Sequence, residues 1–319
     1  MARRHMLATL AAMTVGLSLT VASPSWAATT YDSYTTKATL PDYDCGADSC
    51  TAAQGFAVTS NYLYSIKTDS AHEKSVIYRV DRETGDRVLM RNATSNSNVN
   101  TWLGHANDLQ VVSVNGQKYM FVVTMFDGGD GANSEKQLVK LKYDGTSYEW
   151  DHTYTILSGS TPKGVSGLSK ISQSGNVVSF FFSSGDQVYT GNLDVTAVGG
   201  TANDVALTKA FTMNNRPSGW NTQGIHYDAA NQRFYRPVTS VNSSGESTNR
   251  SRVLIYDGIT AATTGDRSSS ADVKIDITSA NYAKFEIEGV GVNTESGKLY
   301  FSTNRTGSDG VHYVTGYTA

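Results

Sequence analysis

Seven polar residues with chemically useful side chains recur near the beginnings of apolar segments. They are amides, acids and one imidazole: Gln54, His105, Asn107, Asp108, Gln223, Glu286 and Glu288. Asp108 and Glu288 form the candidate carboxylate pair, with His105 beside them. Two facing carboxyl groups can act as general acid and as base or nucleophile on a glycosidic bond. The set predicts a ligand-binding site in which Asp108 and Glu288 are the candidate catalytic residues.

The same residues have a purely structural interpretation. Carboxylates and amides at strand starts often accept hydrogen bonds from buried backbone N–H groups. Asp108 and Asn107 can cap the turn at Gly104 in this way. Ligand binding is the interpretation that we favour, so we expect a binding protein rather than an enzyme. If the protein is an enzyme, it is a glycan hydrolase.

Two other groups of residues bear on metals and redox state. Asp127, Asp130 and Glu135 lie in a glycine-rich segment and offer the oxygen ligands that Ca²⁺ prefers. Their spacing departs from the EF-hand pattern, so a solvated hairpin loop is the simpler interpretation and we expect no cofactor. Cys45 and Cys50 are the only cysteines, too few for a zinc site without histidines at matched spacing. We expect them to form a disulfide in an oxidising compartment.

The elements that must position these residues are strands. Short runs of Val, Ile, Tyr, Phe and Thr alternate with Gly, Asn, Asp and Ser clusters, a pattern typical of strands and tight turns. One sequence phrase occurs five times. In it, a small residue stands at the start of an apolar strand, and a hairpin and a third strand follow. Its glycines are Gly55, Gly104, Gly164, Gly224 and Gly289. Such periods predict the blades of a five-bladed β-propeller, beginning near residues 54, 104, 164, 223 and 288. A β-sandwich is the alternative.

The N-terminal segment completes this scheme. Little chain follows Val314 to supply an outer strand for the fifth blade, and the segment from Tyr31 to Thr36 can pair there. The expected fold is therefore an all-β, five-bladed propeller closed by an N-terminal strand. It forms a single domain over residues 28–319, with its polar strand starts around one axial mouth.

The first 27 residues have the features of a secretory signal peptide. Arg3 and Arg4 precede an apolar stretch, and Ser25-Trp26-Ala27 offers a cleavage site. Cleavage removes two arginines and no acid, leaving 24 basic and 29 acidic residues and a net charge of −5. This balance argues against nucleic acid as a partner. We expect a secreted, extracellular monomer without a transmembrane segment after signal cleavage.

The strand-start phrases also carry a resemblance. Leu103-Gly104-His105-Ala106-Asn107-Asp108 and Glu286-Ile287-Glu288-Gly289-Val290-Gly291-Val292, with Gln54-Gly55-Phe56 and Gln223-Gly224-Ile225, resemble the helveticin J family of class III bacteriocins. The resemblance runs from about Gln54 to the end of the chain. It implies a secreted antibacterial protein that acts on the envelope of Gram-positive bacteria, and it transfers no catalytic residues.

Three functional hypotheses follow. The first is a secreted, bacteriocin-like protein that binds cell-wall glycan or teichoic acid at the axial mouth. The second is a glycoside hydrolase that uses Asp108 and Glu288. The third is a non-catalytic secreted module whose outer loops bind another protein.

Overall fold

The computed structural model describes residues 27–125, 137–197, 204–240 and 249–319. The regular structure of these residues is β-strand throughout, which confirms the predicted all-β class. No described segment forms an apolar helix of the length that a bilayer crossing requires. The predicted signal peptide lies outside the described residues except for its last position. The calcium candidates Asp127, Asp130 and Glu135 also lie outside them.

Twenty strands of the described residues form five antiparallel units of four strands each. Unit 1 contains β5 (Ala52–Val58), β6 (Tyr62–Thr68), β7 (Ser75–Asp81) and β8 (Arg87–Leu89). Unit 2 contains β10 (Asp108–Val114), β11 (Gln117–Val123), β12 (Gln137–Asp144) and β13 (Ser147–Ser158). Unit 3 contains β15 (Gly167–Ser174), β16 (Val177–Ser184), β17 (Gln187–Asp194) and β18 (Asp204–Met213). Unit 4 contains β20 (His226–Asp228), β21 (Arg233–Ser240), β22 (Asn249–Tyr256) and β24 (Val273–Ser279). Unit 5 contains β25 (Phe285–Val292), β26 (Leu299–Arg305), β27 (Gly310–Val314) and, from the N-terminal segment, β2 (Tyr34–Thr39).

Seven further short strands pair with strands of the units or, in one case, with each other. These are β1 (Thr29–Tyr31), β3 (Tyr43–Asp44), β4 (Ser49–Cys50), β9 (Arg91–Asn92), β14 (Thr161–Pro162), β19 (Asn221–Thr222) and β23 (Gly265–Arg267). Parallel pairs link β9 to β13, β13 to β18 and β18 to β23, so neighbouring units share outer strands. The β13–β18 pair makes units 2 and 3 one continuous sheet.

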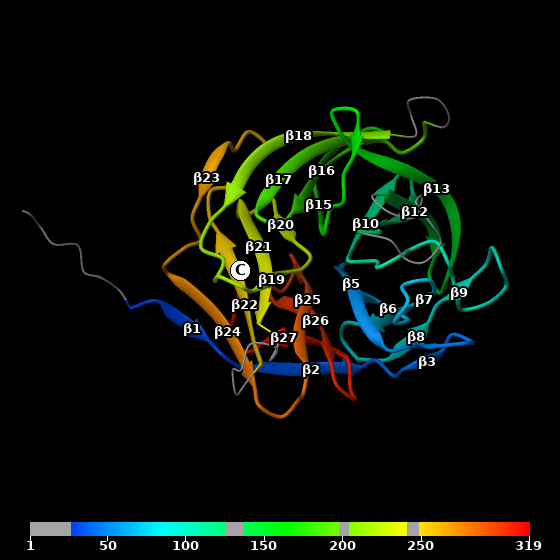
Figure 1. The fold of residues 1–319 in the computed structure, drawn as a ribbon, viewed down its shortest axis with the longest axis horizontal. Coiled ribbons are helices and arrows are strands. Elements are labelled where there is room, and N and C mark those ends of the chain that lie inside the picture. Colours follow the sequence, from blue (N-terminus) through cyan, green and yellow to red (C-terminus); the bar gives the residue numbers. More distant parts are fainter. Residues whose placement is uncertain (1–26, 126–136, 198–203, 241–248) are drawn as a thin grey trace, which may run out of the picture.

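The first strand of each unit is the innermost one. Figure 1 shows the units around a common centre, with β5, β10, β15, β20 and β25 nearest to it. Each of these strands contacts the next in this order, and β25 contacts β5. Hydrogen bonds follow the same path. The Gly55 N–H donates to the Ala106 carbonyl, and the Gly224 N–H donates to the Glu288 carbonyl.

The hydrophobic core lies between neighbouring units rather than within one sheet. Among the described residues it falls into five clusters, and each joins two units that are adjacent around the centre. One of them packs Phe56 and Leu63 of unit 1 against Tyr300 and Val311 of unit 5. Each sheet therefore buries both faces, because each has a neighbour on either side.

Two of the predicted strand-start glycines stand where another backbone or side chain approaches closely. A Cβ atom at Gly55 would lie 2.6 Å from the Ala106 carbonyl oxygen. A Cβ atom at Gly224 would lie 2.8 Å from the carboxyl carbon of Asp108. Contacts this short exclude any side chain, so the lack of room inferred from the sequence has a specific cause at both positions.

The N-terminal segment and the cysteines behave largely as expected. In β2, Tyr34 to Thr36 pair with β27, as predicted for this segment, but the strand runs on to Thr39. Tyr31, which was expected in the same strand, instead pairs with Ile275 in unit 4, because β1 and β2 are separate strands that lie on different units. The predicted disulfide between Cys45 and Cys50 is present.

Candidate functional site

Six of the seven predicted residues line one cavity where the inner strands begin. This first cavity has a volume of about 420 Å³. Its lining contains the predicted Gln54, His105, Asn107, Gln223, Glu286 and Glu288, and also Met125, Asn221, Thr222 and Lys284. Units 1, 2, 4 and 5 all contribute, so residues more than two hundred positions apart in the chain meet here.

β-Bulges present two of these side chains. In β5, the register with β6 shifts between Ala53 and Phe56, which leaves Gln54 outside the regular pairing. In β25, the register shifts between Ile287 and Gly289, which leaves Glu288 outside it. A bulge breaks the alternation of side chains along a strand and commonly re-aims one next to a functional site.

Strand β25 and Lys284, the residue directly before it, supply the charged groups of the first cavity. Glu286 forms an ion pair with Lys284, at 2.7 Å between Oε2 and Nζ. Glu288 is 1% exposed. Burial raises the pKa of Glu288 well above its ordinary value, and the negative charge of Glu286, to which it also hydrogen-bonds, raises it further. The pair therefore combines a carboxyl group that retains its proton with a carboxylate that an ammonium group neutralises.

Two histidine rings stack beside this cluster. Nδ1 of His105 lies 3.1 Å from Nδ1 of His72, and the ring centroids are 4.3 Å apart in an edge-on arrangement. Burial lowers the pKa of both rings, that of His105 to about 3, and the Lys284 charge lowers both further. Both imidazoles are consequently neutral at pH 7, and the N–H of one ring can donate a hydrogen bond to the unprotonated nitrogen of the other.

Asp108 differs from the other predicted residues, because it does not line the cavity. Its carboxylate accepts hydrogen bonds from the backbone N–H groups of Leu109, Leu168 and Ile225, at 2.8 to 2.9 Å. These amides belong to units 2, 3 and 4, so one side chain ties three units together. Burial raises the pKa of Asp108 to about 8, although the three amides oppose the shift.

Two buried acceptor atoms at the cavity lack partners among the described residues. They are Oε1 of Gln54 and Oδ1 of Asn107, in side chains that are 4% and 1% exposed. The Asn107 amide donates its N–H to the Ser166 carbonyl, which fixes the orientation of the side chain. An unpaired buried acceptor costs about 1–3 kcal/mol, so both atoms favour a partner that can donate a hydrogen bond.

The sequence reasoning missed Lys284, His72, Met125, Asn221 and Thr222. Lys284 had a readable signal, since it lies two positions before Glu286, and residues two apart in an extended segment point to the same face. His72 had none, because it arrives from the loop between β6 and β7. In the part of the chain that the structure describes, no three His, Cys, Asp or Glu side chains gather to hold a metal ion.

No protein-family model matches the chain, and no curated protein does. Among solved structures, the chain is similar to a GH43_1 enzyme from Xanthomonas citri complexed with xylotriose, with 9% identity, a TM-score of 0.44, and coverage of 86% of this chain and 89% of that one. An α-L-arabinofuranosidase from Podospora anserina in complex with cellotriose has 8% identity and a TM-score of 0.43, with coverage of 89% and 96%. The C-terminal WD40 domain of Sif2 has 8% identity and a TM-score of 0.36, with coverage of 90% and 99%. These TM-scores are low, so the function has to be argued from the site itself.

Proposed function

We propose that the five units are the blades of a five-bladed β-propeller that β2 closes. Three observations support this architecture. The inner strands contact one another in a cycle that returns from β25 to β5. A hydrophobic cluster fills each junction, including the one between the last unit and the first. The N-terminal strand β2 pairs with β27 and so supplies the fourth strand of unit 5.

The first cavity is a binding site for a carbohydrate. The observation that carries this proposal is the convergence of amide, carboxyl and ammonium groups on one cavity of about 420 Å³, with two acceptor atoms unpaired. Sugar hydroxyls can donate hydrogen bonds to Gln54 and Asn107 and accept them from Lys284. Cavities of this size that hold a few convergent polar groups are typical ligand sites.

The bacterial envelope is the source of glycan that we propose. The resemblance of the strand-start phrases to the helveticin J family supports a secreted, bacteriocin-like protein that acts on Gram-positive cell walls. The charges of the cavity refine this choice. Lys284 is the lysine of the described lining and is already paired with Glu286, and Glu288 has a raised pKa, so the cavity offers no unpaired cation for the phosphate groups of teichoic acid. We therefore propose the uncharged glycan of the wall, rather than teichoic acid, as the ligand of this cavity.

Glycan hydrolysis at the same cavity is the second candidate. The raised pKa of Glu288 favours it, since a general acid must carry its proton near neutral pH. Asp108 is not its partner in this proposal, because three backbone amides occupy the Asp108 carboxylate. The nearer carboxylate is Glu286. Catalytic pairs in glycosidases stand roughly 5–9.5 Å apart, whereas Glu286 and Glu288 hydrogen-bond to each other, so binding ranks first.

The test is binding of the purified protein to Gram-positive cell walls, with and without extraction of teichoic acids. We expect saturable binding that survives the extraction and falls about tenfold or more in Gln54→Ala and in Glu288→Gln, since both side chains line the cavity. Glu149→Gln is the matched control, because Glu149 is an exposed acid in β13. Equal binding by all variants, or none by the wild type, contradicts the proposal. Release of reducing ends from the same samples, abolished by Glu288→Gln, would favour hydrolysis over binding alone.

A further inference from the structure

A second and larger cavity lies at the opposite ends of the inner strands. It has a volume of about 640 Å³. Along β5, Gln54 lines the first cavity and Val58 the second, and along β25, Glu288 lines the first and Val292 the second. Between the two, a small cavity of about 20 Å³ is enclosed by mid-strand residues such as Phe56 and Leu109. The two large cavities are therefore separate sites.

The second cavity differs from the first in the charge of its lining. Lys118 of β11 and Lys170 of β15 both line it, and none of its described lining residues is Asp or Glu, whereas in the first cavity Lys284 is paired with Glu286. Neither lysine forms an ion pair with any other described residue. Nζ of Lys118 lies 5.9 Å from the centre of the Tyr143 ring, and Nζ of Lys170 donates to the Gln173 side chain at 3.0 Å. Burial lowers the pKa of Lys170, a cost that a bound anion would offset.

Aromatic rings form one wall of the second cavity. Tyr62, Tyr64 and Tyr143 line it, with ring centroids 6.3 Å apart for the first pair and 5.6 Å for the second. Arg79 covers the Tyr62 ring, with Cζ 4.3 Å from its centre, and adds a further positive charge nearby. Tyr62 is the half-buried ring of the three, whereas Tyr64 and Tyr143 are 2% and 5% exposed, so Tyr62 offers the apolar face that a sugar ring can reach.

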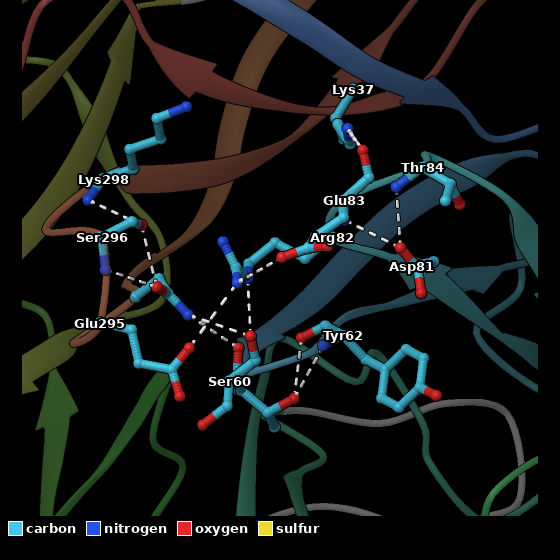
Figure 2. A network of polar contacts seen from close by, with 12 residues as sticks. Lys37, Ser60, Tyr62, Asp81, Arg82, Glu83, Thr84, Glu295, Ser296 and Lys298 are labelled. Carbon is cyan, nitrogen blue, oxygen red and sulfur yellow. Dashed lines mark hydrogen bonds and ion pairs between the residues drawn. The ribbon is translucent and has the colours of Figure 1, made fainter.

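Hydrogen bonds hold the rim of this cavity in place. Figure 2 shows Arg82 between Ser60 and Glu295, where its Nε donates to the Ser60 carbonyl at 2.6 Å and its Nη2 lies 3.7 Å from the Glu295 carboxylate. The Asn293 amide donates to the Thr59 carbonyl at 3.1 Å. These bonds tie the β5–β6 loop of unit 1 to the β25–β26 loop of unit 5. A rim fixed before binding loses less entropy when a ligand arrives.

One further group points to a ligand. Nε2 of His226 is buried and has no hydrogen-bond partner among the described residues. His226 lines both the second cavity and the small cavity beneath it. Burial lowers its pKa to about 4, so the ring is neutral at pH 7 and adds a hydrogen-bonding group rather than a charge.

We propose that the second cavity binds an acidic oligosaccharide, whose carboxylates pair with Lys118 and Lys170 while a sugar ring packs against Tyr62. The carboxylates of the ligand can form ion pairs with the two lysines. Its hydroxyls can form hydrogen bonds with the side chains of Ser60, Asn61 and Ser113, which also line the cavity. This site is independent of the carbohydrate site at the first cavity and differs from it in the charge of its ligand.

The experiment is calorimetric titration of the full protein with trigalacturonic acid and, as the neutral trisaccharide, maltotriose. We expect trigalacturonic acid to bind with an affinity that falls as salt rises, because small ions screen exposed charges. The double variant Lys118→Gln/Lys170→Gln should lose about tenfold or more in affinity, since both charge-assisted contacts disappear. Tyr62→Ala should also weaken binding.

Two controls separate this site from the first cavity and from general charge effects. Lys209→Gln removes an exposed lysine from β18 and should change the affinity less than about twofold. Glu288→Gln alters the first cavity and should leave trigalacturonic acid binding intact. Absence of binding, equal binding of maltotriose, or full affinity in the double lysine variant would overturn the proposal.

Discussion

The two large cavities stand at opposite ends of the same inner strands, yet they differ in charge, burial and supporting contacts. The first holds Glu286 and Glu288, buried among amides. The second holds Lys118, which is exposed, and Lys170, which is half-buried, beside tyrosines. The strand beginnings are crowded and linked by buried hydrogen bonds, whereas a rim of loop contacts frames the strand ends.

This difference shows that the two ends of the same strands can form two sites with different side-chain chemistry. The alternation of a strand determines which face of the sheet a side chain lies on. Its position along the strand determines which of the two cavities it lines. Residues near the start of β25 line the first cavity with other buried polar groups. Val292, at the end of the same strand, lines the second cavity with the tyrosines. A substitution at the first cavity should therefore change both stability and binding, whereas one at the second should change binding more than stability.

The largest effect is expected when the Asp108 carboxyl group is removed. Asp108→Ala leaves three buried N–H groups without an acceptor and should lower the free energy of unfolding by about 3–5 kcal/mol. Urea denaturation measures this loss. Asp108→Asn keeps one acceptor oxygen, so it should lose less. Lys118→Gln, at the exposed second cavity, should change stability by less than about 0.5 kcal/mol. Equal losses of unfolding free energy in Asp108→Ala and Lys118→Gln would contradict the proposed difference between the two cavities.

A smaller effect is expected in the pH dependence of stability. Burial and Glu286 raise the pKa of Glu288 above 4.5, so the folded protein holds a proton that the unfolded chain releases above that pH. The free energy of unfolding therefore falls as the pH rises from 4.5 through the raised pKa. Glu288→Gln removes this titration, so its stability relative to the wild type should increase from about pH 5 to pH 8.

The double variant Lys118→Gln/Lys170→Gln serves as the control for this pH series. None of the described residues that line the second cavity carries a carboxyl group, so the variant should keep the wild-type slope of stability between about pH 5 and pH 8. A flat difference between Glu288→Gln and the wild type would show that Glu288 titrates normally.

The smallest effect is expected at the rim of the second cavity. Arg82→Gln removes the contacts to the Ser60 carbonyl and the Glu295 carboxylate. Because these are peripheral contacts, we expect a loss of about 0.5–1 kcal/mol and a drop in Tm of about 1–2 °C by scanning calorimetry. The affinity for trigalacturonic acid should fall about twofold to threefold. An unchanged affinity would mean that the rim contributes nothing to binding at the second cavity.

The sequence supported much of the architecture because its signals are local. The recurring glycine phrases marked the innermost strand of each unit, and the steric reason given for them holds at Gly55 and Gly224. The short loop between Cys45 and Cys50 predicted the disulfide. The N-terminal segment was expected to pair with the last strand, and Tyr34 to Thr36 do so.

The roles of individual side chains needed the tertiary structure. Asp108 and Glu288 looked equivalent in sequence, as acids at the entry of apolar strands. In the fold, Asp108 binds the amides of three units and Glu288 faces the cavity through a bulge. The physical reason is that a bulge shifts the two-residue alternation of a strand, and the local composition does not predict where a bulge occurs.

The sequence by itself determined the all-β class, the five repeats, the disulfide and the clustering of polar residues at strand starts. Only the tertiary structure decided which of those residues share a cavity, that Lys284 lines it with them, that His72 lies against His105, and that a second cavity lined by lysines exists. Repeats and turns depend on residues that are neighbours in the chain. A cavity lined by four or five units depends on contacts between residues far apart in the chain, which local patterns do not specify.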